Sequence, residues 1–397
     1  SSDIPYMSFP SLLGALFLEG KKNIVVAGTH GKTTTTSIAA WVLEAAGLEP
    51  GFLIGGQVPN FNRTARRADG NYFVIEGDEY DTAFFDKGPK FLHYRPTTAI
   101  LTSVEFDHAD IYRDLEHCQE SFTKLAKIIP QDGCLVARWD HDSVVECAQH
   151  CTGEIFRYGP QQSWDGIIER MDHDTGLMRF TVTHNGKRFG TFDSPMVGEH
   201  NLYNQVAIVA ALAFNGIKAE QMTGFSTFKG IRRRQEVVGE PAGVTVIDDF
   251  AHHPTAIELT LQGLKLKYGD RRLWAVFEPR SATSRRNTLQ AEFAKSFTPA
   301  DIAIVAPPYD QSRIPEAERL NPNQLVDQIR QNGVEAFLIG MKPEGVEEWG
   351  TSEQVDAIIK MIVNHVSPRD VVAIMSNGGF GGIHQKLVQA IQNTMTT

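Results

Sequence analysis

The feature that most constrains the fold is the segment Gly28-Thr29-His30-Gly31-Lys32-Thr33-Thr34. The apolar run 23–27 before it predicts a buried parallel strand, and residues 33–46 after it carry the apolar face of a helix. A strand that passes through a glycine loop into a helix is typical of phosphate binding. Backbone N–H groups can approach the phosphate oxygens, and the helix end adds a partial positive charge. Lys32 would then neutralise phosphate charge, and the Thr33 hydroxyl would ligate Mg²⁺.

This loop is a shortened form of the strict Walker pattern, which has a glycine five positions before Gly31, where this chain has Val26. A Gly-Lys-Thr triplet alone is more typical of an ordinary glycine turn followed by a surface lysine. The strand before the triplet and the helix after it favour the phosphate interpretation.

The rest of the chain predicts an α/β protein of more than one domain, because 397 residues exceed one ordinary core. Strands alternate with helices, as in a doubly wound sheet. Asn185-Gly186, between apolar runs, predicts a hairpin and hence an antiparallel patch in or beside the first sheet. The expected elements are strands at 23–27, 72–75, 98–102, 244–247, 273–277, 302–305, 336–339 and 371–375, and helices at 33–46, 118–129 and 204–214.

These elements divide into a mostly parallel phosphate-loop domain, 21–235, and a Rossmann-like α/β domain, 236–397. Residues 1–20 are expected to be a linker. We place the boundary near Arg234–Glu236.

Two acidic clusters follow two strands of the first predicted sheet. Glu76-Gly77-Asp78-Glu79-Tyr80-Asp81 follows one strand, and Glu105-Phe106-Asp107-His108-Ala109-Asp110 follows the next. Either cluster alone is typical of a solvated loop. Ligands bind at the carboxyl ends of such strands, and Mg²⁺ takes carboxylates together with substrate phosphates. Their position beside the phosphate loop therefore favours a joint metal and nucleotide site.

Four further polar segments are candidates for the site, and three of them have two interpretations. Residues 198–204 would cap a helix or contact an adenine edge, and the run 232–234 would form a solvated face or reach a γ-phosphate. Residues 248–254 are unsuited to a core, and Pro254 is expected to end regular structure. The glycine run 377–382 would meet a ligand carboxylate through its N–H groups or be only a flexible loop.

Composition excludes several classes of protein. Asp and Glu number 48 and Lys and Arg 38, so the net charge of −10 disfavours binding to nucleic acid or a membrane surface. Four cysteines make no disulfide framework or zinc site, so we expect them to be reduced. No apolar stretch of about 18 residues and no signal peptide is visible, and we expect a cytoplasmic protein.

Taken in order, these motifs resemble those of the Mur ligases, which form amide bonds with ATP. The resemblance lies in 28–33, 76–81, 107–110, Gly198-Glu199-His200-Asn201-Leu202-Tyr203-Asn204, 233–234 and Asp248-Asp249-Phe250-Ala251-His252-His253-Pro254. His30 and the last segment resemble the branch that acts on UDP-N-acetylmuramate. Segments 80–87, 277–281 and 375–384 resemble its members that add the tripeptide L-alanyl-γ-D-glutamyl-meso-diaminopimelate during wall recycling.

The resemblance implies roles for individual residues, with ATP and Mg²⁺ as cofactors. The implied catalytic residues are Lys32, Glu79, His108 and Arg234, and the implied metal ligands are Thr33, Glu76, Glu79 and His108. The implied nucleotide contacts are Gly28, Thr29, His30, Gly31, Lys32, Thr33, Thr34, His200, Asn201, Asn204, Asp249 and His252. Arg280, Asn377 and Gly378 would bind the peptide.

The resemblance has two gaps. Phe122 stands where several Mur ligases have a carbamylated lysine. The chain also reaches its phosphate loop by Gly28, so we expect the family's N-terminal UDP-binding domain to be absent. The alternative functions are the same chemistry with L-alanine as the amine, and a nucleotide-binding module without ligase activity.

Overall fold

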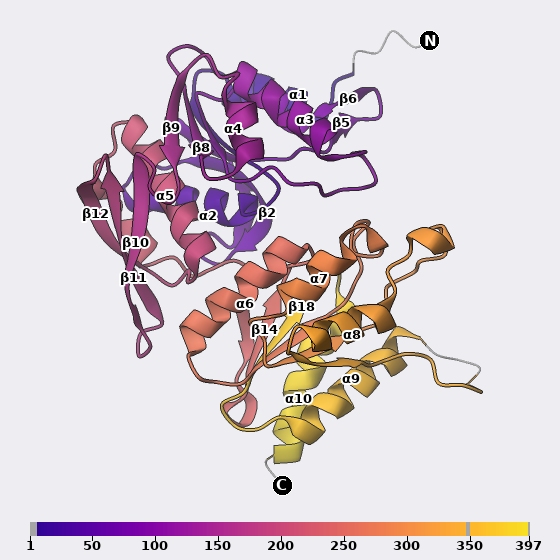
Figure 1. The fold of residues 1–397 in the computed structure, drawn as a ribbon. Coiled ribbons are helices and arrows are strands. Elements are labelled where there is room, and N and C mark those ends of the chain that lie inside the picture. Colours follow the sequence, from indigo (N-terminus) through magenta and orange to yellow (C-terminus); the bar gives the residue numbers. More distant parts are fainter. Residues whose placement is uncertain (1–5, 347–349, 396–397) are drawn as a thin grey trace. The chain divides into compact units, whose positions relative to one another are not determined.

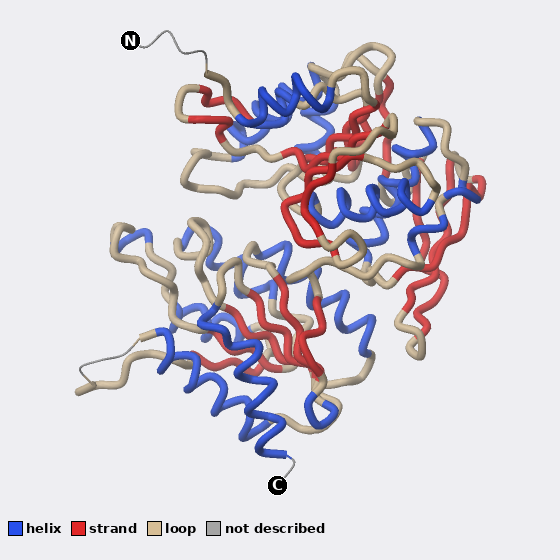
Figure 2. Tube along the Cα trace, turned by 180° about the vertical axis from the view of Figure 1, so that it is seen from behind, coloured by secondary structure: helices blue, strands red, loops and turns tan. Residues whose placement is uncertain are grey.

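The computed structural model describes residues 6–346 and 350–395, which fall into two compact units, 1–231 and 232–397. Each unit has one large β-sheet with helices on both of its faces (Figures 1 and 2). The predicted α/β class is confirmed, with a larger, mostly parallel sheet in the first unit and a separate sheet in the second.

The sheet of the first unit has the strand order β12-β11-β10-β9-β8-β7-β1-β4-β2-β3. It is parallel from β2 across to β9, and β10, β11 and β12 form the predicted antiparallel patch as an extension of the same sheet. Its strands are β1 (Lys22–Ala27), β2 (Gly51–Val58), β3 (Arg63–Arg66), β4 (Tyr72–Gly77), β7 (Thr98–Leu101), β8 (Cys134–Arg138), β9 (Glu154–Tyr158), β10 (Trp164–Asp172), β11 (Leu177–His184) and β12 (Lys187–Ser194). A separate hairpin pairs β5 (Asp81–Ala83) with β6 (Asp86–Pro89).

Helices cover both faces of this sheet because its central strands are apolar on both sides. Ile24 and Val26 of β1 pack in the core with α2 (Lys32–Ala45) and α5 (Glu199–Phe214). Val25 and Ala27 of the same strand point the other way, toward α3 (Leu115–Lys127) and α4 (Asp142–Ala148). This alternation fixes the end of β1, and with it the phosphate loop, between two helical layers.

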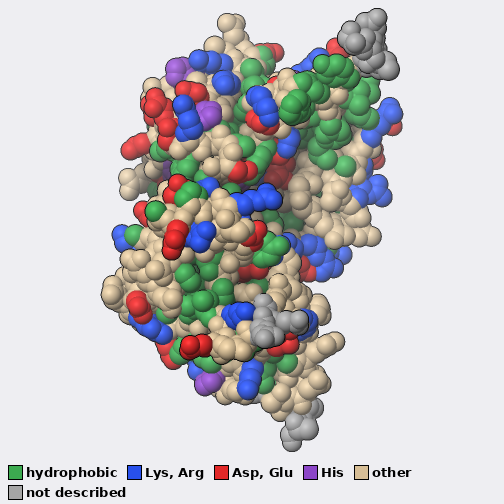
Figure 3. Space-filling view, turned by 90° about the vertical axis from the view of Figure 1, so that its right-hand side faces the viewer, with side chains coloured by type: hydrophobic (Ala, Val, Ile, Leu, Met, Phe, Trp, Pro, Cys, Tyr) green, Lys and Arg blue, Asp and Glu red, His purple; other side chains and the backbone are tan. Residues whose placement is uncertain are grey.

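The predicted linker begins outside the described residues, because 1–5 are not described. Its remainder contains α1 (Phe9–Leu13) and the π-type turn η1 (Gly14–Leu18). Apolar side chains gather on the surface of the first unit near this segment (Figure 3). The exposed large apolar residues of α1, η1 and the β5–β6 hairpin, with those just before α1, are Tyr6, Met7, Phe9, Leu12, Leu16, Phe84 and Phe85.

The sheet of the second unit has the strand order β13-β14-β18-β15-β16-β17 and is parallel except for β13. Its strands are β13 (Glu236–Gly239), β14 (Thr245–Asp249), β15 (Leu273–Phe277), β16 (Ile302–Val305), β17 (Glu335–Leu338) and β18 (Val371–Met375). Helices α6 (Pro254–Tyr268), α7 (Gln290–Ser296) and α8 (Pro322–Gln331) pack on one face. Helices α9 (Thr351–His365) and α10 (Ile383–Met395) pack on the other.

The structure confirms the strands predicted at 273–277, 302–305 and 371–375 to the residue, and the hairpin at Asn185-Gly186. The prediction that Pro254 ends regular structure is wrong. Pro254 is the first residue of α6, where its missing N–H costs nothing and its fixed φ suits the helix.

The four cysteines are free, as expected. Within the described part of the chain, no helix has both the length and the apolar character needed to cross a lipid bilayer.

Candidate functional site

The phosphate loop joins β1 to α2 and depends on two glycines. Gly28 has φ +130°, and a Cβ there would lie 2.2 Å from Oγ1 of Thr102. Gly31 has φ +79°, and a Cβ there would lie 2.8 Å from Oδ1 of Asn204. Both positions therefore exclude a side chain by conformation and by space. No side chain caps the N-terminus of α2, so its first N–H groups are available to an anion.

Lys32 reaches back over the loop to the first acidic cluster. Its Nζ donates to the carbonyls of Gly28 (2.6 Å) and Thr29 (3.2 Å) and lies 2.8 Å from Oε1 of Glu79. Burial alone would lower the pKa of Lys32, but the carboxylates of Glu79, Glu76 and Asp78 outweigh it and raise that pKa. Lys32 is therefore a fixed, fully charged ammonium group beside the anion-binding helix end.

Glu79 connects the phosphate loop to His108 of the second cluster. His108 Nε2 lies 3.1 Å from Glu79 Oε1, and His108 Nδ1 lies 2.8 Å from the Tyr80 hydroxyl. Burial would raise the pKa of Glu79, but Lys32 and His108 lower it below its usual value. The same carboxylate, with Asp107, raises the pKa of His108 against the effect of burial. The three groups form one charged network on residues that follow β1, β4 and β7, which are neighbours in the sheet.

Beside this network the chain offers ligands that suit a hard cation. Thr33 Oγ1 donates to Glu76 Oε1 at 2.8 Å, and Glu76 Oε2 accepts the Gly55 N–H at 2.7 Å. Among the described residues, no donor reaches Oε2 of Glu79, although this atom is fully buried. A buried carboxylate oxygen without a partner fits a bound divalent cation, so the residues present suit Mg²⁺.

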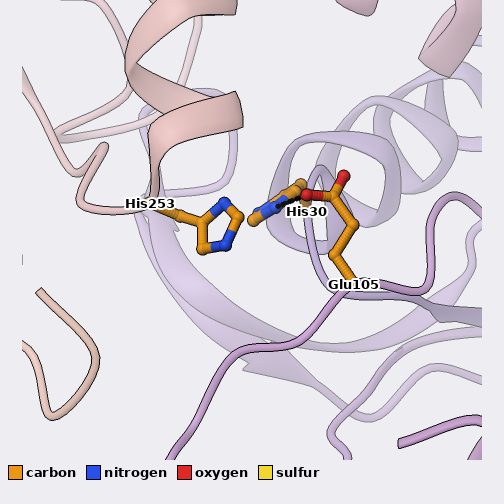
Figure 4. Close-up of side chains that lie close together, drawn as sticks. All are labelled: His30, Glu105 and His253. Carbon is orange, nitrogen blue, oxygen red and sulfur yellow. Dashed lines mark ion pairs between the residues drawn. The ribbon is translucent and has the colours of Figure 1, made fainter. Parts of the chain in front are cut away.

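His30 of the phosphate loop lies against the second acidic cluster. Its Nε2 is 3.5 Å from Oε2 of Glu105, and the two side chains face each other (Figure 4). The backbone N–H of Glu105 also donates to the Thr29 hydroxyl at 2.8 Å. These contacts join the loop after β7 to the loop after β1.

Helix α5 carries the three predicted adenine contacts. Gly198 is the N-cap of α5 and no side chain caps this helix, so the alternative in which the His and Asn side chains cap it is wrong; His200, Asn201 and Asn204 lie inside α5. Asn201 donates to the Val197 carbonyl at 2.9 Å. His200 keeps a partly exposed side chain, yet burial lowers its pKa to about 4, so the imidazole is neutral at pH 7. A neutral imidazole can donate and accept a hydrogen bond.

In the second unit, the arginine run is not a uniform solvated face. Arg232 is exposed, but Arg233 donates to the carbonyls of Ser376 and Gly378, both at 2.6 Å. The guanidinium of Arg234 lies 4.7 Å from the centroid of the Phe250 ring. Arg233 therefore holds the loop after β18, and Arg234 is placed on an aromatic face.

The segment after β14 is more buried than its polarity suggests. Asp248, Asp249 and His253 are all buried, so the expectation that the segment lies outside the core is wrong for them. Asp249 accepts the N–H groups of Gln235 and Ala251, each at 2.8 Å. Burial raises the pKa of Asp249 despite the opposing charge of Arg234. His252 is half-buried, with Nδ1 2.8 Å from the Phe250 carbonyl.

The predicted peptide contacts meet at the carboxyl ends of β15 and β18. A Cβ on Gly378 would lie 2.2 Å from Cδ and Nε of Arg280, so the two residues touch. Asn377, between Ser376 and Gly378, has a buried Oδ1 without a partner among the described residues. Ser376 and Tyr309 are not among the site residues predicted from the sequence, yet both lie in this cluster: Ser376 bonds Glu278 and Gly378, and Tyr309 lies against Arg280. Tyr309 follows β16. The rule that ligands bind at the carboxyl ends of parallel strands, applied to β16 as well, would have indicated Tyr309 as a candidate.

Comparisons with known proteins show which protein families the two units match. Residues 26–212 match the Mur ligase middle domain, and residues 233–378 match the Mur ligase glutamate ligase domain. The UDP-N-acetylmuramate–L-alanyl-γ-D-glutamyl-meso-2,6-diaminoheptandioate ligase of Escherichia coli (strain K12) is 39% identical over 394 residues, covering 98% of this chain and 80% of that protein. The UDP-N-acetylmuramate–L-alanine ligase of Desulfitobacterium hafniense is 33% identical, covering 97% of this chain and 81% of that protein.

Among solved structures, a murein peptide ligase from Psychrobacter arcticus is similar with a TM-score of 0.65 and 34% sequence identity. The match covers 98% of this chain and 81% of that one.

Proposed function

Because the chain belongs to the Mur ligase family, we propose that it joins L-alanyl-γ-D-glutamyl-meso-diaminopimelate to UDP-N-acetylmuramate at the expense of ATP. One observation carries the choice of substrate: the relatives named for that tripeptide are 39% and 36% identical over nearly the whole chain. The relatives named for L-alanine reach 34% or less.

The reaction begins with activation of the lactyl carboxylate of the muramic acid. A carboxylate oxygen attacks the γ-phosphorus of ATP, and ADP leaves, which gives an acyl phosphate. The phosphate loop and the N-terminus of α2 would bind the phosphates, and the Lys32 ammonium would offset the charge that spreads over the transferring group. Arg234 is a second proposed partner for this charge.

Amide formation then completes the reaction. The free amine of the peptide attacks the acyl carbon, and the tetrahedral adduct loses phosphate and a proton to give the amide. Thr33, Glu76, Glu79 and His108 are the residues that would hold Mg²⁺. When bound, this ion neutralises phosphate charge. Glu79 also fixes the position of Lys32 through the contact at 2.8 Å.

The test is phosphate release from ATP in the presence of UDP-N-acetylmuramate and one amine at a time. Release with the tripeptide but not with L-alanine is the expected result. Release with L-alanine alone would assign the protein to the other amine. Release with neither, together with ATP binding, would indicate a nucleotide-binding module and refute the proposal.

A further inference from the structure

Arg280 lies at the point where three loops of the second unit meet. Its own loop follows β15, Ser376 and Gly378 follow β18, and Tyr309 follows β16. These strands are neighbours in the order β18-β15-β16 and run parallel, so their carboxyl ends form one edge. Ligands bind at such an edge in open α/β sheets.

The Arg280 guanidinium is held on one side by an aromatic ring. Its carbon lies 3.8 Å from the centroid of the Tyr309 ring. The backbone N–H of Tyr309 donates to the Pro279 carbonyl at 2.9 Å, which anchors the ring next to Arg280. Tyr309 keeps 43% of its surface exposed, so the ring is not part of the core.

A buried carboxylate and a glycine also contact Arg280. Glu278 is buried and accepts the Ser376 hydroxyl at 2.5 Å and a long hydrogen bond from Arg280 at 3.4 Å. Ser376 Oγ in turn accepts the Gly378 N–H at 2.9 Å. Gly378 has no room for a Cβ, which would lie 2.2 Å from the Arg280 side chain. Its φ lies outside the left-handed region, so space and not conformation requires the glycine.

Most of the hydrogen-bonding capacity of Arg280 is left for a ligand. A guanidinium has five N–H donors in a rigid plane. Within the described part of the chain, Glu278 is the one acceptor found for them, and its bond is long. A planar fork held in one orientation matches a carboxylate, which accepts two parallel hydrogen bonds.

We infer that Tyr309, Glu278 and Gly378 are positioning residues that hold Arg280 at the sheet edge to bind a carboxylate of the amine substrate. The inference deepens the proposed function and rests on it for the identity of that substrate. It assigns to Tyr309 a part in substrate binding that acts through Arg280.

The decisive experiment compares two neighbouring glycines. Gly378→Ala should displace Arg280 while leaving it in the protein, because a flexible side chain yields before the backbone does. Gly379→Ala is the matched control: alanine keeps the backbone N–H that this loop could offer to a ligand, the φ of Gly379 is −81°, and a Cβ there meets nothing within 4 Å. We expect G378A to lower kcat/KM for the tripeptide about tenfold or more, mainly through KM, with the KM for ATP unchanged. G379A should change kcat/KM for the tripeptide less than about twofold.

Two further measurements separate positioning from folding. Tyr309→Phe keeps the ring and should behave like the wild type, whereas Tyr309→Leu should raise the KM for the tripeptide roughly three- to tenfold. A tripeptide whose carboxylates are converted to carboxamides should bind wild type and G378A equally weakly. Equal effects of G378A and G379A, or an unchanged preference for carboxylate in G378A, would overturn the inference.

The outcomes distinguish this inference from the proposed function. If the wild type accepts L-alanine and not the tripeptide, the proposed function fails, and the same variants assayed with L-alanine decide the inference. If the tripeptide is the substrate and G378A equals G379A, only the inference fails. Turnover with neither amine would overturn both.

Discussion

Replacing Lys32 by methionine should reduce both stability and turnover. The loss of stability comes from the broken ion pair with Glu79, and the loss of turnover comes from the missing charge beside the phosphates. The ammonium of Lys32 and the carboxylate of Glu79 are 2.8 Å apart, with side-chain exposures of 14% and 3%. Removing one partner of a buried ion pair typically costs about 3–5 kcal/mol, because the other charge stays buried and unpaired. His108 still contacts Glu79 at 3.1 Å, so we expect the lower end, about 3 kcal/mol. For a unit of this size that corresponds to a fall in Tm of roughly 6–12 °C.

Lys87→Met is the matched control for the thermal measurement. Its Nζ is also 2.8 Å from a carboxylate, that of Asp81, but the side chains are 67% and 37% exposed. An exposed pair contributes about 0–1 kcal/mol, so the Tm should fall by no more than roughly 2–4 °C. Phosphate release should fall about 10²-fold or more in K32M, which loses a preorganised charge, and should stay near wild type in K87M. Equal Tm values for K32M and K87M would refute the argument from burial, and near-normal turnover by K32M would refute the role in phosphoryl transfer.

Three further changes test other parts of the structure. His200→Gln should flatten the pH dependence of the free energy of unfolding. The folded pKa of His200 is about 4 and the unfolded value is about 6.5, so the wild type loses stability as pH falls through this window. Denaturant titrations from pH 7 to 4.5 should show a loss of roughly 2 kcal/mol in the wild type, after allowance for partial exposure. Gly31→Ala should weaken ATP binding at least tenfold by calorimetry, because φ is +79° and the added Cβ would meet Asn204; binding like that of the wild type would contradict the geometry of the loop. Phe122→Ala should cost about 3–5 kcal/mol, since the ring is buried and stacked on Phe91; a loss of turnover without a loss of stability would instead indicate a direct role at this position.

Local signals predicted several elements to the residue. The runs 273–277, 302–305 and 371–375 are apolar throughout, because strands in the middle of a parallel sheet are covered on both faces. Asn185-Gly186 gave the hairpin through its turn preference alone. The prediction for Pro254 is wrong because proline has two opposite effects on a helix. Inside a helix it breaks the helix, but at the first helical position, where Pro254 lies, it is favoured.

Strands with mixed composition were not predicted. β2 (Gly51–Val58) contains three glycines and is buried at only part of its length, so it lacks both the alternating and the continuous apolar pattern. Its place in the sheet comes from parallel pairing with β4.

The sequence by itself determined the phosphate loop, the α/β class and the edge at which polar residues gather, since each follows from local conformation or from strand direction. Tertiary structure alone decided which polar groups meet. Lys32 and Glu79 are 47 positions apart, and Ser376 and Glu278 are 98 apart. Such pairs depend on the order of strands in the sheet, which no local pattern encodes, and on burial, which raises the cost of leaving any of these groups unpaired.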